Sequence, residues 1–114
     1  NSITHLTFEG YFNRPVDNLP NSITHLIFGY EFNQSVDNLP KSITTIGFYS
    51  SSSIRNNIPE NIQTVYIKFC EPDHMNKTVE NLPMSIKKIQ VNKIHKIHFI
   101  NKIPFGCVIE KDLL

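Results

Sequence analysis

The sequence NSITHLIFGYEFNQSVDNLP, residues 21–40, repeats almost letter for letter the stretch before it, NSITHLTFEGYFNRPVDNLP, residues 1–20. A single catalytic or binding site has no use for such a repetition, whereas a stack of similar structural units requires it. The repeat therefore decides the fold, and the fold limits the functions that the chain can have.

The repeat continues along the rest of the chain with lower sequence similarity between the copies. A Leu-Pro or Ile-Pro pair closes each copy, at Pro20, Pro40, Pro59, Pro83 and Pro104. An apolar triplet, spaced three and then two residues apart, opens each copy: Ile3, Leu6, Phe8; Ile23, Leu26, Phe28; Ile43, Ile46, Phe48; Ile62, Val65, Ile67; and Ile86, Ile89, Val91. This spacing predicts five coils, residues 1–20, 21–40, 41–59, 60–83 and 84–104, followed by a degenerate last coil or C-terminal cap over residues 105–114.

The apolar triplets predict one strand in each coil. The last two members lie two residues apart, so both point to one side of a strand, and the residues between and beside them point to the other side. A short repeat with this pattern is typical of leucine-rich-repeat solenoids. About twenty residues leave no room for a strand, two corners and an α-helix. We therefore predict a mainly β, leucine-rich-repeat-like solenoid with a parallel sheet on its concave side and extended or 3₁₀ segments on its back.

Other repeated positions describe the return path. Further apolar columns are expected from Phe12, Phe32 and Met75, from Val16, Val36 and Val79 with Ile54, and from Leu19, Leu39, Ile58, Leu82 and Ile103. Proline after each residue of the last column restricts the backbone and marks a corner. Corners leave backbone groups without strand partners, which an inward asparagine amide can satisfy. We expect such an asparagine ladder from Asn13, Asn33 and Asn76, and from Asn18, Asn38, Asn57 and Asn81.

These motifs resemble the FNIP repeat, a short relative of the leucine-rich repeat found in slime moulds and in giant viruses of amoebae. The resemblance is carried by Ser22-Ile23-Thr24-His25-Leu26, by Phe32-Asn33-Gln34, by Leu39-Pro40 and by the same letters in the first copy. It is close for residues 1–40 and looser to residue 104. It implies a binding scaffold, often downstream of an F-box that recruits a ubiquitin ligase, although no F-box is visible in this sequence.

Composition and charge exclude several classes. The 114 residues carry a formal net charge of +1, and no apolar run approaches the length of a membrane span. The start lacks the features of a signal peptide, and because it lies inside a repeat we expect the chain to be a piece of a longer protein. Cys70 and Cys107 are too few to staple a secreted fold, so we expect reduced thiols and an intracellular, cytoplasmic protein, in the host cell if viral. Two glycosylation triplets, at Asn33 and Asn76, are better explained by the asparagine ladder.

Candidate chemical sites are weak. His5 and His25 share one column on neighbouring coils. Zinc needs three or four ligands, so we interpret them as surface histidines whose pairing makes the patch sensitive to pH. The segment 87–102 holds five lysines, which suits edge protection better than nucleic-acid binding. A Cys70–His74 pair lies in what reads as a lengthened loop. We expect no enzyme, no cofactor, no metal, no nucleic acid and no membrane.

The outward side of the sheet is the candidate binding surface. In solenoids the concave sheet usually binds partners, and Ile27, Tyr49 and Tyr66 form a modest apolar centre there. The candidate residues are His5, Thr7, His25, Ile27, Tyr49, Thr64, Tyr66, Lys68, Lys88 and Gln90. The prediction is a protein-interaction scaffold, with substrate recognition for an F-box ligase adaptor as its sharper form. The alternative is a spacer array without a ligand. An uncapped first coil would stack on further sequence, on a second copy end to end, or fray.

Overall fold

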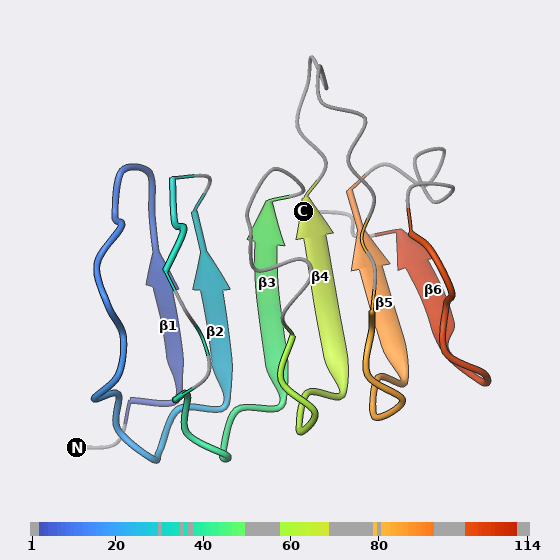
Figure 1. Ribbon diagram of the computed structural model, residues 1–114, viewed down its shortest axis with the longest axis horizontal. Helices are drawn as coiled ribbons and strands as arrows, with labels where there is room; N and C mark the ends of the chain where they lie inside the picture. Colours follow the sequence, from blue (N-terminus) through green and yellow to red (C-terminus); the bar gives the residue numbers. More distant parts are fainter. Residues whose placement is uncertain are drawn as a thin grey trace.

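Six parallel strands form one sheet in a computed structural model of the chain, and they stand side by side in sequence order (Figure 1). The strands are β1 (His5–Phe8), β2 (His25–Phe28), β3 (Thr45–Tyr49), β4 (Thr64–Lys68), β5 (Lys88–Val91) and β6 (Val108–Lys111). The structure describes residues 3–29, 31–34, 36, 38–49, 58–68, 79, 81–92 and 100–111. The predicted fold class is confirmed: the chain is a leucine-rich-repeat-like β-solenoid.

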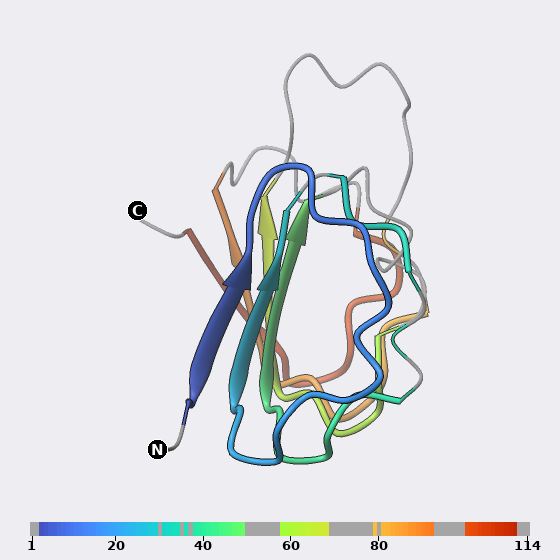
Figure 2. The same cartoon turned by 90° about the vertical axis from the view of Figure 1, so that its left-hand side faces the viewer.

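The strand register follows the repeat. Leu6 lies opposite Leu26, Leu26 opposite Ile46, and Ile46 opposite Val65. Seen from the side, the strands lie along one edge of each coil and the return segments along the other (Figure 2). Parallel strands need such a long return, because a tight hairpin can join only antiparallel neighbours. Among the described residues the return path consists of extended pieces and turns, and the alternative of 3₁₀ segments is not realised there.

The core fills the space between the sheet and the return path. In coil 2 the side chains of Ile23, Leu26, Phe28 and Phe32 are completely buried. Phenylalanine rings also stack within and between the first two coils, with centroids 4.1 Å apart for Phe28 and Phe32 and 5.8 Å apart for Phe8 and Phe28. Aromatic pairs at such distances add to the stability that apolar burial provides. The repeated apolar letters are therefore the columns of one continuous core.

Three apolar residues at the ends of the stack are less buried than the repeat suggests. Ile3 is 53% exposed and Ile103 is 38% exposed, so the expectation that they line the core and close a coil is wrong. Leu6 is half-buried, unlike its counterpart Leu26. The reason is position, since a residue in an end coil has a neighbouring coil on one side only. Met75 and Ile54, expected in the core, lie outside the described residues.

The corners use a polar column that the sequence analysis overlooked. After the proline turns at Pro20, Pro40, Pro59 and Pro83, a polar side chain donates a hydrogen bond to a carbonyl of the preceding coil. Ser22 donates to Ile3 at 2.7 Å, Ser42 to Ile23 at 2.7 Å, Asn61 to Ile43 at 2.8 Å and Ser85 to Ile62 at 2.7 Å. These side chains satisfy backbone acceptors that no strand partner reaches.

The predicted asparagine ladder differs from the structure. The side-chain oxygen of Asn13 does accept a hydrogen bond from the backbone N–H of Asn33, at 2.8 Å, but both residues are exposed rather than inward. Asn18, Asn38 and Asn81 are exposed as well, so the expected inward position is wrong for them. Each precedes the residue that closes its coil, where Asn18 and Asn38 lie in turns and Asn81 has a positive φ of 58°. Asn57 and Asn76 lie outside the described residues.

The last strand differs from the others in its inward column. Register places Lys111 opposite Val91, where earlier strands carry Phe8, Phe28, Phe48 or Ile67. A charged side chain in the core column disfavours the docking of another strand, which is a common way to protect a sheet edge. The lysines of residues 87–102 were expected to have this role. Lys88 lies on β5, which is covered by β6, so that interpretation is wrong for Lys88.

Candidate binding face

The outward side of the sheet, called the strand face below, carries all ten candidate residues on neighbouring strands. Residues one position away from the buried Leu, Ile and Val column point outward, because side chains alternate along a strand. His5, Thr7 and Lys68 are exposed, and the other seven are half-buried: His25, Ile27, Tyr49, Thr64, Tyr66, Lys88 and Gln90. The strand face is therefore a continuous surface rather than a set of scattered positions.

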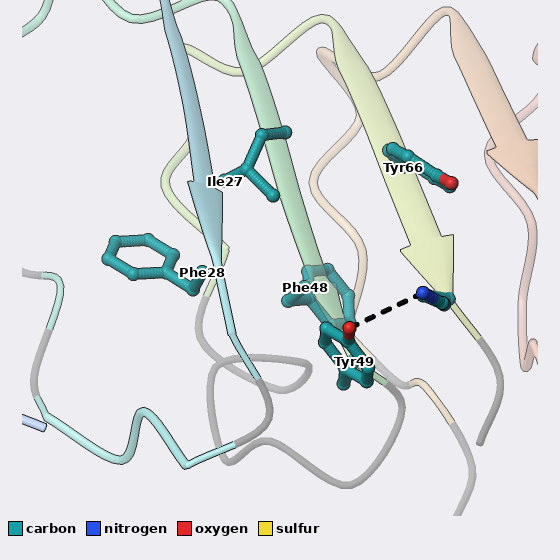
Figure 3. Close-up of a pocket in the computed structure, with 6 residues that line it drawn as sticks. Ile27, Phe28, Phe48, Tyr49 and Tyr66 are labelled. Atoms are coloured by element: carbon teal, nitrogen blue, oxygen red, sulfur yellow. Dashed lines mark hydrogen bonds between the residues drawn. The ribbon is translucent and has the colours of Figure 1, made fainter. Parts of the chain in front are cut away.

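A hollow interrupts the strand face beside Gly47, which lies on β3. Ile27 on β2 and Tyr66 on β4 are its register partners, so a position without a side chain lies between two large ones. The hollow has a volume of about 160 Å³ and is lined by Ile27, Phe28, Phe48, Tyr49, Tyr66 and Lys68 (Figure 3). Its walls are mostly apolar, although it opens on the solvent side of the sheet.

Gly47 lies under the Ile27 side chain, which forms one wall of the hollow. A Cβ atom placed there would come within 2.5 Å of the Ile27 Cδ1 methyl and 3.4 Å of the Tyr66 Cβ. Glycine inside a strand weakens the strand and often marks a close approach or a binding site. This signal was available in the sequence, yet Gly47 was not among the candidates, and neither were Phe28 and Phe48, whose letters indicate core only.

Lys68 places a positive charge at the rim of the hollow. Its ammonium donates a hydrogen bond of 3.4 Å to the Tyr49 hydroxyl, and it lies 5.2 Å from the centroid of the Tyr49 ring (Figure 3). A cation near an aromatic face at this distance is attracted by the electron-rich ring. Among the described residues, no carboxylate forms an ion pair with Lys68, whereas Lys88 pairs with Glu110 at 3.0 Å.

The two histidines stack at the edge of the strand face. The ring centroids of His5 and His25 are 4.1 Å apart, with planes inclined by 13°. Thr4 and Thr24 contact their Nδ1 atoms at 2.9 and 2.8 Å. Burial, and to a lesser extent the neighbouring His5, lowers the pKa of His25 below its usual value. The pair therefore resists carrying two positive charges.

Metal and catalytic sites have little support in the described part of the chain. It contains no group of three metal-ligating side chains around the histidine pair or elsewhere. Cys107 is a free thiol, and burial raises its pKa, which keeps it in the less reactive protonated form. Cys70 and His74 lie outside the described residues. No helix occurs in the described part of the chain, hence none that could cross a membrane.

Comparison with known proteins agrees with the coil geometry. The family model described as FNIP Repeat matches residues 1–30 and residues 12–51. Residues 1–51 therefore carry FNIP repeats. The match lies on the coils in which the Phe stack and the regular corners are found, and the later coils follow the same register with altered letters.

A solved structure shows the same fold as the FNIP repeats. It is CroV588 of a giant virus, described as a novel circular LRR protein structure. The similarity has a TM-score of 0.57 at 23% identity and covers 97% of the FNIP-repeat chain. The chain spans about a fifth of that protein, 21% of its length. No curated protein sequence matches the chain significantly.

Proposed function

We propose that this FNIP-repeat chain is an interaction scaffold that binds a peptide segment of another protein on its strand face, with the hollow beside Gly47 as the anchoring point. Leucine-rich-repeat folds generally serve as protein-interaction scaffolds. The single observation behind this proposal is the hollow, about 160 Å³ in volume, on the strand face. Protein interfaces draw most of their binding energy from a few large side chains that fill such pockets.

The substitution Gly47→Ala tests the hollow with little risk to folding. Gly47 does not have a positive φ, so its backbone suits any residue. The nearest obstacle to a new methyl group is the flexible end of Ile27, which can turn aside toward the hollow. Replacing glycine by alanine within a strand also removes an entropic cost of folding. Gln90→Ala is the matched control, because Gln90 lies in the same outward column on β5 and does not line the hollow.

The experiment is a selection from a displayed library of random peptides on the immobilised chain. We expect peptides that bind the wild-type chain and the Gln90→Ala variant alike, and that lose at least about tenfold in affinity with Gly47→Ala. The triple variant Ile27→Ser, Tyr49→Ser, Tyr66→Ser should fold and lose the same peptides. A selection that yields no peptide dependent on Gly47 would refute the proposal and favour a spacer array.

A ligase-adaptor role is a sharper form of the same proposal. FNIP repeats often follow an F-box, so a protein held on the strand face would be presented for ubiquitination. If so, ubiquitination of a captured protein in cells should fall with Gly47→Ala and stay unchanged with Gln90→Ala. If a protein is captured but its ubiquitination does not change, the scaffold function is supported and the adaptor function is refuted.

A further inference from the structure

We infer that the hollow receives an aromatic side chain that has a carboxylate beside it, so that the preferred partner is a peptide segment with an acidic residue next to Phe, Tyr or Trp. This inference rests on the proposed binding of a peptide at the hollow. Three observations carry it: the volume of the hollow, the side chains that line it, and the charge at its rim.

The volume fits one ring. The hollow measures about 160 Å³ and is lined mainly by Ile and aromatic side chains. An apolar protein cavity of about 150 Å³ lined by Leu, Ile and Phe takes up benzene. A shorter aliphatic side chain would leave part of the hollow empty, and unfilled space loses the dispersion contacts that a ring would make.

The walls favour an aromatic group over other apolar groups. Tyr49 and Tyr66 both line the hollow, as does Phe48, which lies next to Tyr49 on β3 (Figure 3). Aromatic rings that pack in offset or edge-to-face contact gain about 0.5–1.5 kcal/mol beyond their buried area. A ring inserted beside Tyr66 can make such a contact, whereas Ile27 provides the aliphatic wall on the other side.

The charge at the rim favours a carboxylate. Lys68 is exposed, lines the hollow and makes no ion pair within the part of the chain that the structure describes. Lys88, on the neighbouring strand β5, is by contrast paired with Glu110. A carboxylate next to the inserted ring would therefore meet the ammonium of Lys68, which no carboxylate among the described residues neutralises.

Phenylacetate is the simplest probe, because it joins one ring to one carboxylate. NMR titration would follow the Ile27 Cδ1 methyl and the Gly47 amide, with benzyl alcohol as the uncharged ring and acetate as the charge without a ring. We expect saturable shifts with phenylacetate, about two- to fivefold weaker binding of benzyl alcohol, and no saturation with acetate. Lys68→Gln should remove the preference for phenylacetate, and high salt should reduce it.

Two controls make the result decisive. Lys87→Gln removes an exposed lysine that does not line the hollow, so it should leave phenylacetate binding unchanged. Gly47→Ala should weaken both aromatic probes equally. Equal binding of phenylacetate and benzyl alcohol to the wild-type chain would refute the preference for a carboxylate. Saturable binding of acetate would refute the requirement for an aromatic ring.

The peptide selection distinguishes a failure of this inference from a failure of the proposed peptide-binding function. If peptides that depend on Gly47 are rich in aromatic residues with an acidic neighbour, both stand. If those peptides lack this pair, the scaffold stands and the inference about its partner is wrong. If no peptide depends on Gly47, the proposed function fails, whatever the small probes do.

Discussion

Leu26 and His25 are neighbours in β2 with opposite roles, and a comparison of their alanine variants measures this difference. Leu26 is completely buried, so Leu26→Ala leaves a cavity and should lower the free energy of unfolding by about 2–5 kcal/mol. His25 lies on the strand face, so His25→Ala should cost less than about 1 kcal/mol. Chemical denaturation of the two variants gives both values. Equal losses would contradict the alternation of inward and outward residues along the strand.

The histidine pair predicts a loss of stability in mild acid. Because the pKa of His25 is lower in the folded chain than in the unfolded chain, the unfolded state takes up the proton first as pH falls. The stability associated with neutral His25 is therefore complete above the unfolded pKa of about 6.5 and is lost as pH falls toward the lowered folded value.

Denaturation midpoints at pH 7.5 and pH 5.5 measure this loss. The wild-type chain should lose more stability between the two pH values than His25→Gln, which has no proton to gain. His5→Gln should lose an intermediate amount, since burial remains as the larger cause of the shift. An identical pH dependence in all three chains would show that the pair has no effect on folding.

At the scale of the element, each coil is tied to the one before it by the polar side chain that follows the proline turn. Ser42 donates to the Ile23 carbonyl at 2.7 Å, so Ser42→Ala leaves a half-buried acceptor without this donor. We expect a loss of about 1 kcal/mol in the free energy of unfolding. Ser42→Asn is the control, because Asn61 makes the equivalent bond in the next coil. A loss as large with Asn as with Ala would indicate that the hydrogen bond is not the cause.

The strands and core columns could be predicted because their signal lies in local spacing. Leu26, Ile46 and Val65 recur at the period of the repeat and are buried for the same reason. The role of Ser42 was hidden, since serine after proline is also what an ordinary turn contains. The hollow was hidden for another reason. Gly47 shows that a side chain is missing, but the sequence does not show that Ile27 covers this position and that the hollow lies beside it.

At the scale of the whole molecule, stability should fall toward the β1 end of the stack. Leu6 and Phe8 are half-buried, whereas their counterparts in β2 and β3 are buried. In a stack where each coil contacts only its neighbours, an end coil has one interface and an inner coil has two. The partial exposure of Ile3, Leu6 and Ile103 could not be predicted from the sequence, because the same types of residue are buried in inner coils.

Native-state hydrogen exchange tests this gradient. Amides of β1 should exchange by local opening well before those of β3 and β4, which are paired on both sides. Leu6→Ala should therefore speed exchange in β1 and leave β4 unchanged. Protection in β1 equal to that in β3 would mean that the stack opens as one cooperative unit.

The constant offset between the first two coils has a consequence for how such chains grow. Backbone pairing there joins each residue to its counterpart twenty positions further on, as His5 to His25 and Phe8 to Phe28. A second copy of residues 21–40, inserted after Pro40, would pack between two coils whose surfaces already fit this sequence. Lengthening beyond β6 would instead bury the ammonium of Lys111. Gene duplication can thus extend the array from within at little structural cost. The same position is suitable for inserting additional coils by protein engineering.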